Sequence, residues 1–527
     1  MEPHPRRIGH WFRASLVVFA LFCTALVHAA SVLKVVTQSD LKVIDPVMFP
    51  AYIVRNHGLM VYDVLFATDA NGAIKPQMVD TWSVSPDQLT WTFKLRPGLK
   101  FHDGKPVTAA DVVASLKRWA GRDNAGKRMM DAAAEVKAAD ASTFVLRMKA
   151  PYGLVLETLG KPGSPAFIMP ERIAATPSDQ PIKDATGSGP FIFQPQEWRP
   201  GVRVVYLRNP DYKPRAEPPS GLAGGKVAKV DRVEWVSMPD AQTAANALMA
   251  GEVDLIEAPP ADLLPMLKSN KNVGLFAWDR LGTQYWMVFN HLQPPFNDAR
   301  VRRAAMLAIE QEDIMMAQVG DPERYTICSS PLVCGTPYAK DFGKLGAKAD
   351  VAQARKLLKE ARYDGTPIAV MSAADFPTLS QVGPVVEQQL QAVGFKVNLL
   401  TMDWQSIQSR RTRKDPVAQG GWNMFFTRTA AVDVMNPLFH PGASGACERA
   451  YFGWPCDPEM EALRERFATT TDKAAQLKVA QEIQDRMVSQ GFYGWLGEVK
   501  QVGAFRAGHV SGWVASPALV LWNIEKK

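Results

Sequence analysis

Aromatic side chains are unusually frequent in the second half of this sequence, and they are its clearest candidates for binding chemistry. Flat apolar side chains with a few polar anchors are typical of the walls of small-molecule clefts. From this pattern we predict a ligand-binding role for Tyr285, Trp286, Trp404, Phe425, Phe426 and Trp495. The alternative for each ring is ordinary packing in a hydrophobic core.

Catalytic motifs are not evident. The segment Gly442-Ala-Ser-Gly445 lacks the spacing of a Gly-x-Ser-x-Gly nucleophile turn, and no His-Glu-x-x-His helix occurs. The five histidines that follow residue 29 lie far apart in the sequence, so each is expected to be a packed or surface residue. We therefore predict a binding protein without catalytic residues, cofactor or metal. A secreted hydrolase stays as an alternative, because the members of a catalytic triad need not be neighbours in sequence.

The N-terminus has the three-part pattern of a secretory signal peptide. A polar segment with Arg6, Arg7 and Arg13 precedes a short apolar run, and small residues follow at Ala29 and Ala30. The apolar run is shorter than the roughly 20 residues that span a bilayer. We predict that residues 1–29 are removed near Ala29/Ala30 and that the mature chain works outside the cytosol, in the periplasm.

Four cysteines remain after the signal peptide, and they form two local pairs. In an oxidising compartment the simplest pairing is Cys328–Cys334 and Cys447–Cys456, each closing a small loop. Zinc binding is the alternative, but zinc sites favour closer cysteine spacings with further ligands nearby.

Length and charge exclude several classes of protein. The chain has 527 residues, more than one ordinary core accommodates, so at least two domains are expected. With 47% hydrophobic and 21% charged residues, the composition is that of a globular protein. The net charge of +7 falls to about +5 without residues 1–29, and no basic run indicates nucleic acid.

Alternating strand and helix patterns predict mixed α/β sheets. Residues 91–96 alternate apolar and polar side chains, as a half-buried strand does, and Thr108 with Asp111 forms a capping box for the next helix. A second α/β unit is expected at residues 280–490. It contains strands near 285–290, 367–371 and 395–400 and helices that begin at Asp298 and Asp350.

Several longer motifs resemble the family 5 extracellular solute-binding proteins of ABC importers, the family of the dipeptide- and oligopeptide-binding proteins. The resemblance extends over essentially the whole mature chain. It is carried by residues 91–104 (WTFKLRPGLKFHDG), Pro106-Val-Thr-Ala-Ala-Asp-Val112, Gly187-Ser-Gly-Pro-Phe191, Arg208-Asn-Pro-Asp-Tyr212 and Pro295-Phe-x-Asp-x-Arg-Val-Arg302.

The resemblance implies a type II periplasmic-binding-protein fold, with two lobes of mixed sheets joined by a hinge. Lobe 1 would comprise residues 30–279 with an extra subdomain at about 55–180, and lobe 2 residues 280–490. Residues 491–527 would return to lobe 1. The ligand would lie between the lobes, and a monomer would deliver it to permease subunits at the inner membrane.

One segment departs from the peptide-binding members of that family. There, a Trp and a following Asp precede an Asp/Glu-Pro pair, and the Asp holds the α-amino group of the peptide. The matching segment here is Phe425-Phe426-Thr427-Arg428-Thr429, ahead of Asn436-Pro437. Phe426 then replaces the Trp and Thr429 the Asp. We therefore add Thr427, Arg428 and Thr429 to the predicted site and expect an anionic or strongly hydrogen-bonding group beside Arg428.

The predicted function is the capture of peptides or peptide-like solutes for an ABC importer. The cargo could instead be a non-peptide anionic solute such as an opine, a sugar or a metal chelate. A secreted sensor or chaperone built on the same fold is a further alternative.

Overall fold

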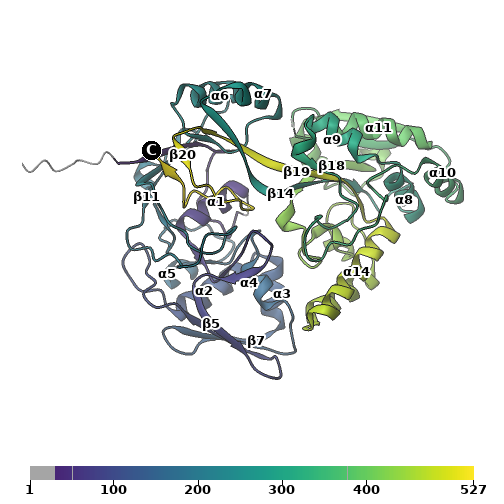
Figure 1. The fold of residues 1–527 in the computed structure, drawn as a ribbon. Coiled ribbons are helices and arrows are strands. Elements are labelled where there is room, and N and C mark those ends of the chain that lie inside the picture. The colour runs from purple at the N-terminus through teal and green to yellow at the C-terminus, as the bar shows by residue number, and fades with distance from the viewer. Residues whose placement is uncertain (1–29, 50, 377) are drawn as a thin grey trace, which may run out of the picture.

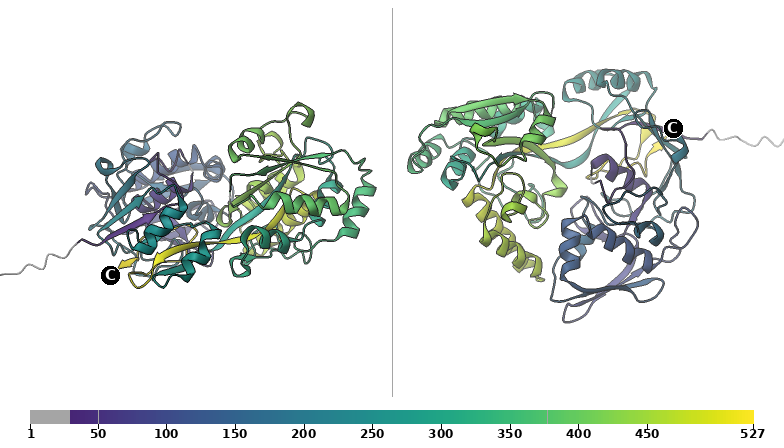
Figure 2. Two further views of the ribbon diagram at one scale, coloured as in Figure 1. Left: turned by 90° about the horizontal axis from the view of Figure 1, so that it is seen from above. Right: turned by 180° about the vertical axis from the view of Figure 1, so that it is seen from behind.

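The computed structural model describes residues 30–49, 51–376 and 378–527, so the predicted signal peptide at residues 1–29 lies outside the described residues. The chain folds into two lobes that lie side by side (Figures 1 and 2). Two long strands, β14 (Val273–Phe289) and β19 (Tyr493–Arg506), run together from one lobe into the other. These two strands make the connection between the lobes.

A single mixed sheet passes through both lobes. Its strand order is β10-β11-β12-β1-β13-β19-β14-β18-β16-β17, with β15 paired to β19. The sequence predicts mixed sheets joined by a hinge. In the structure the connecting strands are themselves hydrogen-bonded, so the sheets of the two lobes are continuous. The strands of lobe 1 in this sheet are β1 (Val32–Val36), β10 (Phe191–Phe193), β11 (Arg203–Arg208), β12 (Arg232–Val236) and β13 (Leu255–Ile256).

The extra subdomain of lobe 1 is built on a four-stranded antiparallel sheet of order β5-β6-β8-β7. In β6 (Thr90–Leu95), Phe93 and Leu95 are buried and Lys94 is exposed, as the alternating sequence predicts. Helix α2 (Ala109–Ala120) begins at the capping box of Thr108 and Asp111. The remaining elements of this region are β5 (Val79–Val84), β7 (Ala133–Ala138), β8 (Thr143–Met148), α3 (Asn124–Ala132), α4 (Val155–Gly160) and α5 (Glu171–Ala174).

The sheet of lobe 2 has a parallel part. Strand β16 (Ile368–Ala373) pairs in parallel with β17 (Val397–Met402) and with β18 (Met424–Ala430), so the carboxyl ends of all three strands lie at one edge. The helices of this lobe are α8 (Ala299–Leu307), α9 (Gln311–Val319), α10 (Val351–Glu360), α11 (Val382–Val393), α12 (Trp404–Arg410), α13 (Pro458–Thr469) and α14 (Lys473–Gln490).

The two connecting strands are irregular where they cross between the lobes. The pairing of β14 with β19 shifts register between Ala277 and Asp279 and again between Asp279 and Thr283. Gly282 lies in this bulge with a φ of +68°, and an added Cβ would stand 2.0 Å from the Val499 carbonyl oxygen. A residue with a side chain would clash there, so the bulge depends on this glycine.

Helix α1 (Tyr52–Val61) has no counterpart in the sequence-based prediction. Every residue from Ile53 to Val61 is buried, including Arg55, Asn56 and His57. A helix that is buried all round shows no alternation of apolar and polar faces, which explains why the pattern failed to reveal it. The other elements are β2 (Asp63–Val64), β3 (Phe66–Thr68), β4 (Ile74–Pro76), β9 (Phe167–Ile168), β15 (Tyr325–Thr326), β20 (Val510–Ser511), β21 (Glu525–Lys526), α6 (Ala241–Ala250) and α7 (Leu264–Ser269).

Both predicted cysteine pairs are joined in the structure. The sulfur atoms of Cys328 and Cys334 are 2.11 Å apart, and those of Cys447 and Cys456 are 1.97 Å apart. Each bond closes a short loop in lobe 2. Among the described residues, no helix combines the length and the apolar character that crossing a membrane requires.

Candidate ligand-binding site

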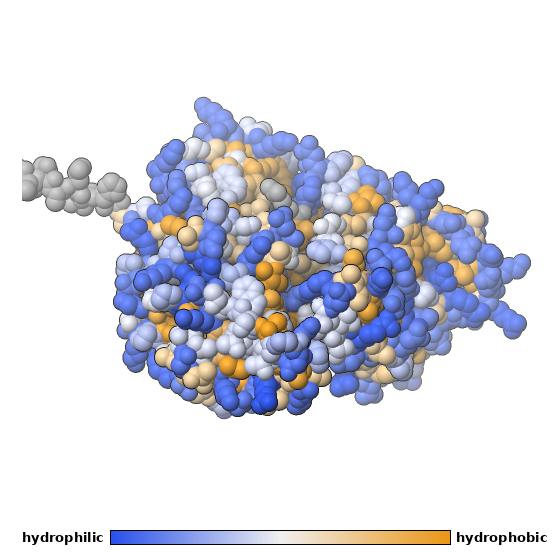
Figure 3. Space-filling view, turned by 60° about the horizontal axis from the view of Figure 1, so that its bottom comes forward, coloured by the Kyte–Doolittle hydropathy of each residue, from blue (hydrophilic) through white to orange (hydrophobic). Residues whose placement is uncertain are grey.

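A cavity of about 1190 Å³ lies between the two lobes. One wall comes from the subdomain of lobe 1, with Trp119, Tyr152 and Lys161, and the other from lobe 2, with Phe439 and Phe452. Ligand pockets usually measure roughly 300 to 1,000 Å³. On the face shown in Figure 3, hydrophobic residues are visible in the furrow between the lobes, while the outer rims are largely hydrophilic. The cavity is therefore large enough for a solute of peptide size.

The lobes touch one another around this cavity. The Gly153 N–H donates to the Ala468 carbonyl at 2.8 Å. At the rim, Arg128 of lobe 1 and Glu465 of lobe 2 form an ion pair at 2.6 Å. Closure of this kind surrounds a ligand and excludes water from it.

An acidic residue, Asp433, lies beside one of the segments that line the cavity. Tyr52, at the start of α1, donates its hydroxyl to Asp433 Oδ2 at 2.8 Å and accepts the Ala430 N–H at 3.2 Å. Burial, and next the Asp433 carboxylate, raise the pKa of the Tyr52 phenol well above its ordinary value, so the phenol stays a donor. Asp433 also lies against Gly163, between the lining residues Lys161 and Ser164. Asp433 and Tyr52 are absent from the set predicted from the sequence.

Two arginines and four aromatic residues gather where β16 and β17 end and along the neighbouring strand β18. We call this set the arginine–aromatic cluster; its members are Phe376, Trp404, Arg411, Phe425, Arg428 and Phe452. Its centre is a stacked pair, Phe376 and Trp404, whose ring centroids are 5.2 Å apart. In open α/β sheets, ligands bind at this edge, outside the carboxyl ends of the strands.

Both arginines of the cluster lie over aromatic rings. Arg428 Cζ is 5.3 Å from the centroid of the Phe376 ring, and Arg411 Cζ is 4.3 Å from that of Phe452. The Nε atoms of both arginines are buried and have no hydrogen-bond partner among the described residues. Phe452 lines the cavity, so Arg411 contacts a wall residue of the cavity, although neither arginine is itself part of the lining.

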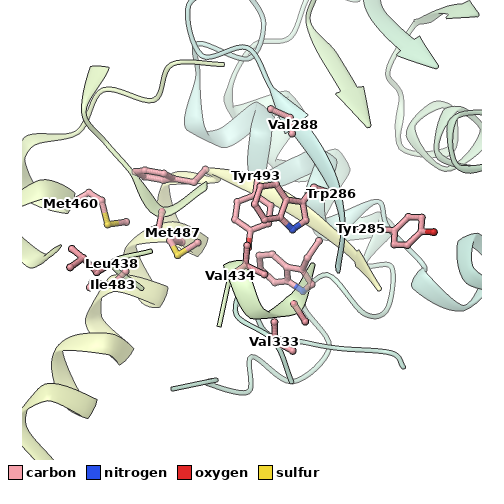
Figure 4. Close-up of a cluster of buried hydrophobic side chains, with 14 of the residues drawn as sticks. Tyr285, Trp286, Val288, Val333, Val434, Leu438, Met460, Ile483, Met487 and Tyr493 are labelled. Carbon is pink, nitrogen blue, oxygen red and sulfur yellow. The ribbon is translucent and has the colours of Figure 1, made fainter. Parts of the chain in front are cut away.

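Tyr285 and Trp286, neighbours on β14, project from opposite faces of the sheet. Trp286 is buried, stacked on His440 at 5.0 Å between centroids and packed on Tyr493 at 4.7 Å. Figure 4 shows Trp286 and Tyr493 together, with Tyr285 pointing away from them. Tyr285 lies opposite Arg428 in the pairing of β14 with β18.

The other predicted residues are distributed between core and cluster. Phe426 and Trp495 are 2% and 1% exposed, so they pack in the core of lobe 2. Phe425 and Trp404 belong to the cluster. Buried Thr427 makes a side-chain hydrogen bond with Tyr451, which lines the cavity, whereas Thr429 is half-buried. None of the nine predicted residues lines the cavity itself. The cavity walls come instead from residues 46–48, 119–132 and 438–465 and from parts of 152–164, and no sequence pattern indicated that these segments bind a ligand.

A metal centre finds little support in the described part of the chain. The group with suitable spacing there is Cys328, Cys334 and Glu498, and its two sulfur atoms are bonded to each other. Glu498 accepts the Cys334 N–H at 3.1 Å, and burial raises the pKa of its carboxyl to about 7. This carboxyl lies on the connecting strand β19, apart from the cavity lining.

Comparison with known protein families gives a match over most of the chain. Residues 73–446 match the family described as "Bacterial extracellular solute-binding proteins, family 5 Middle". A relative from Sinorhizobium fredii, described as "Probable peptide ABC transporter periplasmic-binding protein y4tO", is 37% identical over 475 residues, covering 89% of both chains.

Two further comparisons agree with this match. The glutathione-binding protein GsiB of Pectobacterium atrosepticum is 27% identical over 491 residues, covering 90% of each chain. The crystal structure of the ABC transporter substrate-binding protein CtaP from Listeria monocytogenes superposes with a TM-score of 0.79. It has 22% identity and covers 94% of this chain and 99% of that one.

Proposed function

The chain belongs to the family 5 bacterial extracellular solute-binding proteins, and from this premise we propose that it captures a peptide or peptide-like solute that carries an anionic group. It is the periplasmic solute-binding component of an ABC importer and works with permease subunits in the membrane. The y4tO and GsiB proteins, named for a peptide transporter and for glutathione, support a peptide-like cargo.

The observation that carries the proposal is that the site offers one carboxylate and one guanidinium, and that neither has an oppositely charged partner in the described protein. Asp433 lies beside the lining residues Lys161 and Ser164 and has no cationic partner among the described residues; Arg428, five residues earlier, has no anionic partner there. A carboxylate and a guanidinium held open in this way match the ammonium and carboxylate ends of a peptide-like solute. Asp433 would therefore hold an amine, a role for which residues 425–429 contain no carboxylate.

A non-peptide anionic solute is the second candidate, and the same Arg428 supports it. An opine, an acidic sugar or a metal chelate would also present an anion to the guanidinium. Such a ligand need not carry an amine for Asp433. The amine is therefore the chemical feature that separates the two candidates.

The test is the identity of what the protein retains. The mature protein is expressed in the periplasm, purified and denatured, and the released small molecules are identified by mass spectrometry. A set of short peptides would support the peptide cargo. A single non-peptide acid would replace it with the second candidate, and a neutral ligand would contradict both.

Membership of this family also supports proposals on processing, oligomeric state and domain boundaries. We propose cleavage near Ala29/Ala30, a monomer, and no catalytic role. We also propose that lobe 1 comprises residues 30–279 with the inserted subdomain at about 55–180, and lobe 2 residues 280–490. Residues 491–527 would then leave lobe 2 along β19 and return to lobe 1. The first boundary falls within the bulge of β14, where the pairing with β19 is irregular.

A further inference from the structure

Arg411 is the second guanidinium of the arginine–aromatic cluster, and it differs from its neighbours in having no partner. It follows helix α12 directly. Its Cζ lies 4.3 Å from the Phe452 ring centroid, 5.7 Å from that of Trp404 and 5.9 Å from that of Phe425. No carboxylate of the described chain forms an ion pair with it.

Neighbouring arginines are satisfied by the protein. Arg410 donates to the carbonyls of Gly420 and Gly421 at 3.0 and 2.9 Å. Arg413 pairs with Asp415 at 2.9 Å and donates to the Gln419 carbonyl. Among residues 410–413, the guanidinium groups of Arg410 and Arg413 are therefore hydrogen-bonded within the protein, whereas that of Arg411 is not.

Stacking on aromatic rings orients a guanidinium without using its N–H donors. The face of the group contacts the ring, and the donors at its edge stay available for a planar anion. Arg411 and Arg428 both have this arrangement, and the stacked Phe376 and Trp404 rings link them. A buried N–H donor without a partner is unfavourable, so a bound anion would relieve that cost at both positions.

Two acids on these loops, Asp375 and Asp403, are already engaged by backbone amides. Asp375 accepts the Trp404 N–H at 2.7 Å. Asp403 caps helix α12 by accepting the Ser406 N–H at 2.8 Å. Neither carboxylate forms an ion pair with Arg411 or Arg428, so the cluster carries a surplus of positive charge.

We propose that the ligand carries two anionic groups, one held by Arg428 and the second by Arg411. This inference rests on the proposed function, which places a solute in the cleft between the lobes. With an amine at Asp433, the preferred solute would be an acidic peptide or an acidic amino-acid conjugate. A neutral peptide, with one carboxylate, would leave Arg411 unpaired.

The first experiment counts the anionic groups on the ligand that the purified protein retains. Accurate mass, together with methyl esterification of each free carboxyl group, gives this number directly. Two or more anionic groups are expected; a ligand with one or none overturns the inference. A peptide with a single carboxylate would leave the proposed function standing, and a doubly anionic non-peptide would leave only the inference standing.

The second experiment uses a matched pair of probes, the dipeptides Ala-Glu and Ala-Gln, with calorimetric titration. They differ in one anionic group. The wild-type protein should bind Ala-Glu about tenfold or more tightly than Ala-Gln, since a hydrogen bond to a charged group contributes about that much. Equal affinities would contradict the second site, and a protein that retains no ligand and binds neither dipeptide would contradict both proposals.

Two variants assign the preference to one residue. Arg411→Gln should abolish the preference for Ala-Glu and leave the affinity for Ala-Gln nearly unchanged. Arg413→Gln, the same change two residues along the chain at a guanidinium with its own partners, should keep the preference. If Arg411→Gln still prefers Ala-Glu to Ala-Gln, another group of the protein binds the second anion.

Discussion

Charge is arranged in opposite ways in two regions of the molecule, the buried ion pairs Arg118–Asp45 and Lys226–Asp63 of lobe 1 and the arginine–aromatic cluster of lobe 2. In lobe 1, Arg118 and Asp45 are each 1% exposed and pair at 2.7 Å, while Asp45 also accepts backbone N–H groups of Val47 and Ile182. Lys226 and Asp63 form a second such pair at 2.8 Å. In lobe 2, the partly buried guanidinium groups of Arg411 and Arg428 face aromatic rings and have no charged partner in the described part of the chain.

The ion pairs of lobe 1 therefore stabilise the fold, whereas we expect the unpaired arginines of lobe 2 to bind a ligand. A buried ion pair that is fully hydrogen-bonded holds loops together. Removing one partner is strongly destabilising, because the other charge stays buried without compensation. A guanidinium without a partner contributes little to folding but is ready to bind an anion. Mutations in the two lobes should therefore separate stability from affinity.

The largest effect is expected at the buried pair of lobe 1. Asp45→Ala leaves Arg118 buried and uncompensated, so the free energy of unfolding should fall by about 3–5 kcal/mol. Denaturant unfolding measures this change. Arg411→Gln is the control from the other lobe and should lower stability by less than about 1 kcal/mol; equal losses in both variants would remove the distinction between the lobes.

Glu498, a buried acid on the connecting strand β19, should destabilise the folded protein when it is ionised. Burial raises the pKa of Glu498 to about 7 from an ordinary 4.5, so the folded state holds a proton that the unfolded state releases between these values. Stability should therefore decrease as the pH rises from about 4.5 to 7.

Glu498→Gln tests this dependence, because glutamine resembles the protonated acid. At pH 8 the variant should be more stable than the wild type by up to about 3 kcal/mol, and near pH 4.5 the two should agree. Thermal or denaturant unfolding at both pH values provides the comparison. A variant that is less stable at pH 8 would show that the ionised carboxylate is required.

The third effect concerns ligand affinity rather than stability. Arg428→Gln removes a charge-assisted contact, so affinity for the retained ligand should fall about 10- to 100-fold, with stability unchanged or slightly higher. Calorimetric titration and denaturant unfolding are carried out on the same samples. Unchanged affinity would place the anion elsewhere.

The smallest effect is expected at the acid between the lobes. Asp433→Asn keeps a polar partner for Tyr52 and loses the negative charge, so affinity for a ligand with a free amine should fall about tenfold. The N-acetylated form of the same ligand should bind the wild type and the variant equally. A loss of the same size for both forms would indicate a structural role for Asp433.

Local signals in the sequence predicted many elements well. The capping residues Thr108, Asp298 and Asp350 start α2, α8 and α10, since a side-chain acceptor at a helix start acts within three residues. Helix α1 escaped prediction because its burial on all sides removes the amphipathic pattern. With it went Tyr52, the partner of Asp433.

The site was only partly predictable for a different reason. Arg428 is recognisable as a charge in an apolar strand segment, but its lack of a partner depends on where Phe376 and other distant side chains lie. Arg411 sits among three other basic residues at 410–414, and only the fold shows that the neighbouring arginines are satisfied. Whether a charged side chain has a partner depends on residues that are distant in sequence, so the unpaired charge of Arg411 and Arg428 could not be predicted.

The continuous pairing of β14 with β19 affects how the molecule melts. Two lobes linked by flexible peptide would unfold as independent units, with two heat-absorption peaks. Here one ladder of backbone hydrogen bonds extends from Val273–Arg506 in lobe 1 to Val288–Tyr493 in lobe 2. Neither lobe can melt without opening strands that belong to the other. The lobes should therefore share one calorimetric transition, and a ligand held in lobe 2 should protect the backbone amides of lobe 1 from hydrogen exchange.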